Sequence, residues 1–389
     1  MKPMFYQFAG ASMWRRVGRL AAVVAIGGAG LAACGGAGPL PPALADPALR
    51  EQQRQAFVDA MKPARAGRPV VAIVALNEGT EVTDFLLPHA LLQRAGVADV
   101  QPVAVQRGRV QLTPALAVDL PQSLADFDRA HPRGADIVIV PAMVQDDHPA
   151  VSAWLKRQAG QGARILGICS GARVVGQAGL LDGRRFAGHW FDRSTLLRRH
   201  AGAVHVPHQR YLADRGVATT TGITASLPAM LALVEALGGR ERASALAAEI
   251  GVPDWAPEHD SAPFGLTLPR AASYLAAKAA FWRHQRQLVD VRDGADDIAL
   301  ALAADAWSRT GHVQVNAVAE GAGRVRLASG LALQVGGADA GLPRIVLAPG
   351  LKPAAQLDRT LCEIDSRFGA ARRQWVMQEM EYAGPLACG

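Results

Sequence analysis

The sequence predicts an α/β protein: a doubly wound parallel sheet, followed by a partial, degenerate second copy of the same unit. Three observations support this prediction. Short apolar runs alternate with helical stretches between residues 68 and 255, as in parallel sheets covered on both faces. One apolar run leads into a helix through the turn Gly167-Ile168-Cys169-Ser170-Gly171. Towards the C-terminus, glycines and apolar residues repeat the pattern of the first part at a constant spacing.

The strands and helices are expected in a regular order. Each expected strand is a short, mostly apolar run, which is typical of a buried parallel strand. These runs are residues 70–74, 100–105, 137–140, 164–168 and 217–220. The expected helices are residues 82–95, 154–161, 172–178 and 227–237. Gly96 follows the first of these helices, and Gly238 and Gly239 follow the last, as glycines commonly do at helix ends.

The N-terminus has the pattern of an exported lipoprotein. Arg15, Arg16 and Arg19 precede an apolar run at residues 20–33, which is the layout of a secretory signal peptide. Cys34 directly follows Leu-Ala-Ala and resembles the cysteine of a bacterial lipobox. On this interpretation Cys34 is the lipidated first residue of the mature protein. A plain signal peptide or an uncleaved anchor is the alternative.

These features divide the chain into five segments. They are a signal peptide (1–33), a tether (34–67) with a helix at 47–61, the first α/β domain (68–255), a connection (256–286) with a helix at 271–287, and the partial second copy (287–389). The mature protein is expected in the bacterial cell envelope, anchored by its lipid and facing the periplasm. Gly35 after the lipidated cysteine favours the outer membrane if the host is Gram-negative.

Charge and cysteine content exclude some partners. The formal net charge is +7, but four positive charges belong to the signal peptide, and removing them leaves about +3. No dense basic block interleaved with aromatic residues remains, so no nucleic-acid partner is expected. No Cys or His spacing indicates a metal site, and no cofactor is predicted. Cys362 and Cys388 could form a disulfide in an oxidising compartment or remain two free thiols.

The repeat has one constant offset along the chain. Three glycines have counterparts at this offset, namely Gly79 and Gly294, Gly96 and Gly311, and Gly108 and Gly323. After a shorter loop, residues 137–141 match residues 345–349. Chance similarity between strands rich in Ala, Val and Gly is the alternative. The second copy has no G-x-C-x-G turn, so we expect it to lack the chemistry. It would pack on the first domain or on a partner, because half a domain cannot close its own sheet.

The turn around Cys169 is typical of a nucleophile elbow, in which a strand, a G-x-C-x-G turn and a helix follow one another. The flanking glycines relieve crowding, and the cysteine side chain projects above the sheet. We expect the positive end of the following helix to lower the pKa of the Cys169 thiol. Ser170 would hydrogen-bond a substrate or cap the helix. The alternative is that Cys169 is simply a small buried apolar residue.

Several motifs in the expected order resemble the ThiJ/PfpI family, part of the class I glutamine-amidotransferase-like superfamily. These motifs are residues 79–88 with the helix end at 94–96, and residues 168–172, 178–190 and 221–226. The resemblance covers about residues 68–252. It is closest to the branch that contains isonitrile hydratases and the amidase-like halves of AraC-type regulators. It implies a flavodoxin-like fold, here without a helix-turn-helix domain.

The resemblance also implies roles for individual residues. Cys169 matches the nucleophile, Asp84 the acid that hydrogen-bonds it, and His189 a histidine often found near the thiol. Backbone N–H groups match the oxyanion site at four positions, Ser170, Gly171, Ala142 and Met143. The family usually has Pro-Gly-Gly where this chain has Pro141 followed by Ala and Met, which would narrow that site. Asp84 could instead be solvated, and His189 could instead pack in the core with Trp190.

These residues favour a cysteine-dependent hydrolase, hydratase or glyoxalase-like lyase that acts on a small electrophile. The Cys169 thiolate would attack carbon, backbone N–H groups would stabilise the developing charge, and Asp84 would handle the proton. A second possibility is a non-catalytic ligand-binding or redox-sensing lipoprotein, whose thiol becomes sulfenic acid. A third is a protein derived from a transcription regulator, because residues 243–252 resemble one helix of a helix-turn-helix unit as well as the family's closing helix. The expected partners are a small molecule, the membrane through Cys34, and a second copy in a homodimer, since related proteins often dimerise.

Overall fold

A computed structural model of the chain describes residues 46–265 and 285–388, apart from residues 322, 338, 340, 385 and 387. The expected signal peptide and Cys34 lie outside the described residues. So does most of the helix expected at 271–287; its last three positions instead begin a strand at Gln285. Within the described ranges, no helix combines the length and apolar character needed to cross a membrane.

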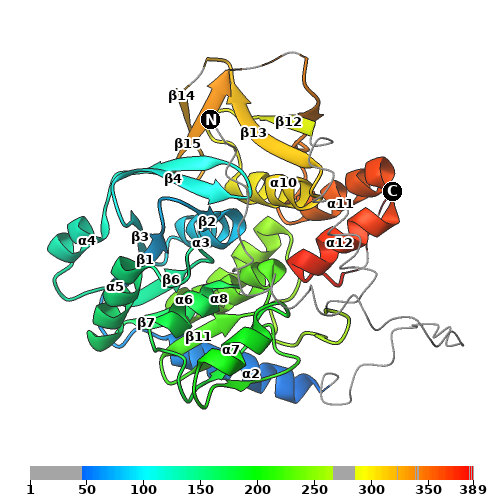
Figure 1. Cartoon of the computed structure of the whole chain (residues 1–389). Coiled ribbons are helices and arrows are strands. Elements are labelled where there is room, and N and C mark those ends of the chain that lie inside the picture. Colours follow the sequence, from blue (N-terminus) through cyan, green and yellow to red (C-terminus); the bar gives the residue numbers. More distant parts are fainter. Residues whose placement is uncertain are drawn as a thin grey trace, which may run out of the picture.

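The first domain is built on a six-stranded sheet (Figure 1). Its spatial order is β10 (Tyr211–Asp214), β11 (Val217–Thr220), β7 (Arg164–Gly167), β6 (Ile137–Val140), β1 (Val70–Ala75) and β3 (Asp99–Ala104). All neighbouring strands are parallel except β10 and β11. The predicted parallel sheet is therefore confirmed, and each expected strand lies within one residue of its predicted bounds.

Helices cover both faces of this sheet. One face carries α2 (Pro47–Met61), α3 (Val82–Ala95) and α8 (Ser226–Ile250), and the other carries α4 (Leu124–Ala130), α5 (Pro149–Gly160) and α6 (Gly171–Gln177). Because side chains alternate along a strand, Val71 and Ile73 of β1 join one core, while Ala72 and Val74 join the other. The continuous apolar run of β1 is thus explained by two buried faces.

Two helices extend beyond their expected bounds. Helix α8 was expected to end at the glycine pair, but only Gly239 leaves the helical conformation, and the helix resumes to Ile250. Ala243 and Leu246 are buried in the core, so apolar packing continues the helix past the kink, as expected of a closing helix. Helix α5 begins at Pro149, where a proline lacking an N–H is well tolerated in the first turn.

Part of the expected tether belongs to the first domain. The predicted helix at 47–61 is present as α2, and it packs on α8. Phe57 and Met61 are buried in the core, and Arg54 forms a buried ion pair with Glu235 of α8. An apolar face and a buried ion pair together fix this helix to the domain. Residues 47–61 are therefore part of the globular unit rather than of a free tether.

The C-terminal half adds a second sheet that joins the first domain. Its order is β16 (Arg344–Ile345), β12 (Gln285–Asp290), β13 (Val313–Ala319), β15 (Ala332–Gly337), β5 (Ala117–Leu120), β4 (Gly108–Thr113) and β2 (Thr80–Glu81), and β14 (Gly323–Arg326) pairs with β15. Strands β15 and β5 are antiparallel, so the two halves share one sheet. Helix α10 (Asp297–Arg309) packs against α3, and α11 (Ala355–Phe368) and α12 (Ala370–Met380) lie at one side (Figure 1).

Elements of the two halves coincide at the repeat offset, the one that relates Gly79 to Gly294. Strands β1 and β12 coincide at both ends, because residues 70 and 75 correspond to residues 285 and 290. Helices α3 and α10 begin at corresponding positions, 82 and 297. The hairpins β4–β5 and β14–β15 have the same register: Arg109 with Asp119 and Val110 with Val118 correspond to Arg324 with Gln334 and Val325 with Leu333.

Contacts between the halves are reciprocal at the same offset. Arg94 of α3 pairs with Asp296 at 2.6 Å, and Arg309 of α10 pairs with Glu81 at 3.0 Å. At the repeat offset, Arg94 corresponds to Arg309, and Glu81 corresponds to Asp296. Each ion pair therefore joins the arginine of one half to the acid of the other half, and the two pairs are equivalent. Reciprocity of this kind is what a two-fold contact between two copies of one surface produces.

The C-terminal segment is tied to α11. Cys362 of α11 and Cys388 form a disulfide with a Cα–Cα separation of 5.6 Å, within the usual range. Of the two alternatives for these cysteines, the structure contains the disulfide. It holds the residues that follow α12 against α11.

Gly171 allows α6 to begin against the end of β6. A Cβ atom added at Gly171 would lie 1.9 Å from the carbonyl oxygen of Val140. We expect Gly171→Ala to lower the free energy of unfolding by about 3 kcal/mol or more, because backbone must shift to relieve the overlap. Urea denaturation measures this. Gly160→Ala is the control, since nothing lies within 4 Å of its added Cβ, and it should change stability by less than about 1 kcal/mol. Similar effects of the two substitutions would contradict the account.

Candidate functional site

Cys169 lies in the turn between β7 and α6, at the carboxyl end of the parallel strands. Its φ of 51° falls in the left-handed region, which costs a non-glycine residue conformational energy. The Cys169 N–H donates to the Thr220 hydroxyl at 3.0 Å, and the Gly171 N–H donates to the Ile168 carbonyl at 2.7 Å. These bonds hold a strained strand–turn–helix junction, which is the geometry of a nucleophile elbow.

Asp84 lies in the first turn of α3, and its side chain is fully buried. Glu81 caps this helix by accepting the Asp84 N–H at 2.6 Å. Asp84 Oδ2 accepts the Ala142 N–H at 3.0 Å, whereas Oδ1 has no hydrogen-bond partner among the described residues. The hydrogen bond expected between Asp84 and Cys169 is therefore not formed in this structure. Burial, and then the charge of Glu81, raises the pKa of Asp84 well above its usual range. The alternative of a solvated Asp84 is therefore wrong, and its carboxyl favours the protonated form.

The Cys169 thiol differs from expectation. Only 6% of the residue is exposed, and burial raises the pKa of the thiol well above its usual value, with the charges of Asp84 and Asp192 acting in the same direction. The expectation of a lowered pKa is therefore wrong. Because burial is the largest cause, the direction does not depend on whether Asp84 is ionised. The helix that follows, α6, has only seven residues, and its N-terminal field does not reverse this shift.

Of the two residues expected at the oxyanion site after Pro141, Ala142 uses its N–H within the protein, whereas the Met143 N–H has no hydrogen bond among the described residues. The Ala142 N–H is taken by Asp84, and the Ala142 carbonyl accepts the Glu81 N–H at 2.8 Å. Met143 is buried and forms an antiparallel bridge with Thr80 of β2. The Ala142 donor therefore serves the Asp84 carboxyl rather than an open pocket.

Of the other two expected donors, the Gly171 N–H is engaged, whereas Ser170 is engaged through its side chain and its N–H has no hydrogen bond within the described ranges. The Ser170 hydroxyl donates to Asp192, so it does not cap α6. Arg173, in α6, also donates to Asp192, with 3.4 Å between its Nη1 and Asp192 Oδ1. The Gly171 N–H is taken by Ile168 within the turn. In this arrangement Asp192 orients the first residues of the elbow helix.

His189 faces the C-terminal half rather than the thiol. Its Nε2 lies 3.1 Å from the carbonyl oxygen of Glu379, in α12, and its Nδ1 accepts the Phe191 N–H at 3.4 Å. Its ring also packs beside Trp190. Both ring nitrogens are engaged, so the packed alternative describes His189 here, and the structure does not bring it together with Cys169 and Asp84.

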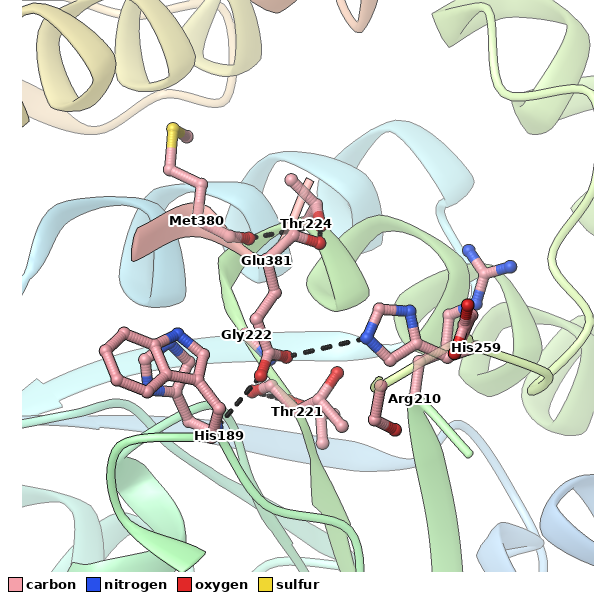
Figure 2. Close-up of polar contacts among 12 residues, drawn as sticks. His189, Arg210, Thr221, Gly222, Thr224, His259, Met380 and Glu381 are labelled. Carbon is pink, nitrogen blue, oxygen red and sulfur yellow. Dashed lines mark hydrogen bonds and ion pairs between the residues drawn. The ribbon is translucent and has the colours of Figure 1, made fainter. Parts of the chain in front are cut away.

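Figure 2 shows a contact that the sequence did not reveal, in which Glu381 reaches from the end of α12 into the first domain. Its Oε1 accepts the Trp190 N–H at 2.9 Å, and its Oε2 accepts the Gly222 N–H at 2.5 Å. His259 Nε2 lies 3.9 Å from Oε2. The Thr224 hydroxyl donates to the Glu381 carbonyl at 2.8 Å. A buried carboxylate therefore lies at the edge of the sheet where the elbow is.

The link to the elbow is short. Gly222 comes two residues after Thr220, the last residue of β11, whose hydroxyl accepts the Cys169 N–H. Strand β11 pairs directly with β7, which leads into the elbow. Gly222, which binds the Glu381 carboxylate, and Cys169 therefore follow neighbouring parallel strands, at the edge where α/β sheets bind their ligands.

The sequence profile of the DJ-1/PfpI family matches residues 70–236. These residues form a DJ-1/PfpI family domain. The resemblance to ThiJ/PfpI proteins is thereby confirmed. The HTH-type transcriptional regulator GlxA of Rhizobium meliloti is 31% identical over 183 residues, which cover 46% of this chain and 55% of GlxA. The isonitrile hydratase of Pseudomonas putida is 28% identical over 189 residues, which cover 45% of this chain and 79% of the hydratase.

A solved structure also matches the DJ-1/PfpI domain. DJ-1beta of Drosophila melanogaster is 20% identical, with a TM-score of 0.43, and the match covers 48% of this chain and 99% of that one. The chain spans about half the length of GlxA.

Charged residues of the C-terminal half reach the DJ-1/PfpI domain beside Asp84. Arg309 binds Glu81 at 3.0 Å, Asp305 at 2.8 Å and Glu379 at 3.3 Å. Three carboxyl groups thus share one guanidinium, and burial raises the pKa of the innermost, Asp305, to about 8. The charge of Arg309 acts to lower the pKa of Asp84. The C-terminal half supplies the cation of this cluster.

Most of these contacts had no usable signal in the sequence. Glu81 is the exception, because it lies three residues before Asp84 within the motif that carries the family resemblance. The repeat offset related Arg94 to Arg309, but it did not predict that each would bind the opposite half. Glu381 is one glutamate in a polar helical stretch of the sequence. Only the fold places it against Trp190 and Gly222 of the DJ-1/PfpI domain.

Asp305 provides a test of the charge cluster. Because its pKa is raised from the ordinary carboxyl range to about 8, the folded protein holds a proton that the unfolded chain releases, and stability falls as pH rises from about 4 through about 8. Asp305→Asn removes this decline. The free energy of unfolding of the variant, relative to that of wild type, should therefore increase with pH, by up to about 1.4 kcal/mol per pH unit over this range. Denaturant unfolding at several pH values measures this difference. Asp290→Asn, at an exposed position on β12, is the control. Parallel profiles for wild type and Asp305→Asn would contradict the account.

Proposed function

We propose that the DJ-1/PfpI domain performs cysteine-dependent chemistry on a small electrophile, with Cys169 as nucleophile and Asp84 as proton relay. The observation that carries this proposal is the strained Cys169 turn together with a fully buried carboxyl, Asp84, whose charge acts on the thiol and whose Oδ1 has no partner among the described residues. A buried carboxyl that favours the protonated form can donate a proton in a reaction and take one back.

The proposed step needs no oxidant or metal. The Cys169 sulfur bonds to the electrophilic carbon of a C–X multiple bond, and the electron pair of that bond moves to the heteroatom X. Asp84 gives its proton to X and receives the thiol proton, so the S–H bond is replaced by C–S and X–H bonds. Water then adds at the same carbon, the C–S bond breaks, and the sulfur regains a proton. The net reaction is addition of water to the electrophile.

A relative supports the hydratase class. The isonitrile hydratase matches over most of its own length. For an isonitrile the terminal carbon takes both the sulfur and the proton, so the S–H bond is replaced by C–S and C–H bonds, and addition of water with cleavage of the C–S bond then gives a formamide and the free thiol. Hydrolase and glyoxalase-like lyase activities use the same nucleophile and relay, and they belong to the same proposal.

A second candidate is non-catalytic ligand binding or redox sensing. The buried Cys169 with a raised thiol pKa favours it, as does the use of the Ala142 N–H by Asp84. In the sensing version an oxidant such as a peroxide converts the thiol to sulfenic acid. A regulator-derived role rests on the similarity to GlxA, of which the chain spans about half.

We also propose that the protein is exported, lipidated on Cys34 and held in the bacterial cell envelope, facing the periplasm. The Leu-Ala-Ala-Cys sequence supports this, and so does the Cys362–Cys388 disulfide, because disulfides persist in oxidising compartments. Mass spectrometry of the N-terminal peptide from the native host tests it. An acylated Cys34 is expected, and an N-terminus that begins at Met1 would contradict it.

We further propose that the C-terminal half is a partial second copy of the first domain. It occupies the place that a partner subunit would take. The shared hairpin register and the reciprocal ion pairs support this, as does the pairing of Val118 with its own counterpart, Leu333. The surface of the first domain that would otherwise bind a second copy is then covered by the C-terminal half of the same chain. We therefore expect a monomer in place of the homodimer expected from the family. Light scattering of the chain without its lipid measures this. A dimer cross-linked through β5 would contradict it.

Replacement of the nucleophile tests the proposed activity. We expect Cys169→Ala to abolish turnover of a panel of isonitriles, nitriles and 2-oxoaldehydes without changing the circular dichroism spectrum. Asp84→Asn should lower turnover by about 100-fold or more, because the amide cannot relay the proton. Asp290→Asn is the matched carboxyl control on the surface. Unchanged turnover in Cys169→Ala would sink the proposal, and binding without turnover in the wild type would favour the second candidate.

A further inference from the structure

We propose that the backbone N–H groups of Trp190 and Gly222 form a carboxylate-binding subsite next to the Cys169 elbow, which Glu381 fills from within the same chain. The two donors bind the two oxygens of Glu381 separately, at 2.9 and 2.5 Å. Such paired donors match the two acceptor oxygens of a carboxylate. Figure 2 shows the Glu381 side chain reaching between Gly222 and His259.

Both donors are positioned by the DJ-1/PfpI domain itself. Trp190 follows β8 (Arg185–Phe186), and the Ala187 N–H fixes this loop by donating to the Thr219 hydroxyl of β11 at 2.9 Å. Gly222 directly precedes the 3₁₀ turn η2 (Ile223–Ala225), and the neighbouring Thr221 N–H donates to the Arg210 carbonyl at 2.8 Å. The donors would therefore remain in place if the Glu381 carboxylate were absent.

Further polar groups at the subsite have unused capacity. The Thr221 hydroxyl oxygen and His259 Nε2 are buried, and neither has a hydrogen-bond partner within the described ranges. Thr221 is only 3% exposed. Because buried polar groups are usually hydrogen-bonded, these two atoms point to a ligand with more polar atoms than the Glu381 side chain provides.

The docking of α12 does not depend on the Glu381 carboxylate. Backbone carbonyls at its end are held independently: the Trp190 indole N–H donates to Gln378 at 2.9 Å, and the Thr224 hydroxyl lies 3.2 Å from the carbonyl of Met380. Glu381 itself has a φ of 50°, which is strained for a residue with a side chain. The carboxylate is thus a separable group that stands in for a ligand.

The chemical class follows from these donors. The subsite would accept a small organic anion through its carboxylate, with Thr221 and His259 contacting its other polar atoms. In the wild type such an anion competes with the Glu381 carboxylate, which holds both donors. The subsite does not rest on the proposed function of Cys169.

Chemical rescue tests the subsite. In the chain carrying Glu381→Ala, sodium acetate should restore the missing contacts, so Tm should rise progressively with acetate concentration, relative to sodium chloride at equal ionic strength. Wild type should show no such rise, because Glu381 already fills the subsite. Glu363→Ala, at a partly exposed position on α11, is the matched control and should behave like wild type. Titration with ¹³C-acetate, followed by NMR, should show saturable binding only to Glu381→Ala.

Two further sets of variants separate loss of the subsite from loss of folding and from failure of the proposed chemistry. If Glu381→Ala does not fold, Glu381→Gly suits the left-handed backbone at this position and also leaves the subsite empty, so acetate should raise its Tm. The measurements are repeated with Cys169→Ala added, so that failure of the proposed chemistry leaves the binding result unaffected. A folded Glu381 variant that neither binds acetate nor gains stability from it would overturn the subsite.

Discussion

The packing of α3 against α10 is the contact on which the rest of the site depends. Both helices are buried on nearly all sides, and each carries a charged residue of the site near one end. Asp84 lies in the first turn of α3, and Arg309 lies in the last turn of α10, where it binds the capping residue Glu81. Buried helices cannot shift independently in a close-packed interior. The C-terminal half therefore helps to set the position and charge of the Asp84 carboxyl.

Two opposing effects act on the Cys169 thiol, and their sizes decide between them. A helix N-terminus stabilises an anion by about 0.3–1 kcal/mol, and by about 2 kcal/mol at most. Full burial shifts a pKa by as much as 3–5 units, and each unit corresponds to about 1.4 kcal/mol. Burial therefore prevails at Cys169, which is almost inaccessible to solvent. In the proposed chemistry, Cys169 becomes reactive through proton exchange with Asp84 at the moment of attack rather than as a thiolate that is already present.

The sequence predicted the features that depend on local patterns. Buried parallel strands are continuous apolar runs, so β1, β6 and β7 were found within one residue, and the Gly96 cap fixed the end of α3. It could not predict features created by contacts between distant segments. Strands β4 and β5 form a hairpin that is completed by β15, and the burial of Cys169 depends on everything packed around it. The Glu381 contact joins segments that lie far apart along the chain, and nothing in the local sequence marks it.

The most direct test of the account is the pH dependence of Cys169 alkylation by iodoacetamide in the folded chain, with the modified peptide quantified by mass spectrometry. Cys169 is the free cysteine among the described residues. The account predicts slow alkylation with a midpoint above the ordinary thiol value of about 8.5, because burial disfavours the thiolate. Fast alkylation with a midpoint below that value would contradict it, and would mean that the elbow holds an exposed, stabilised thiolate.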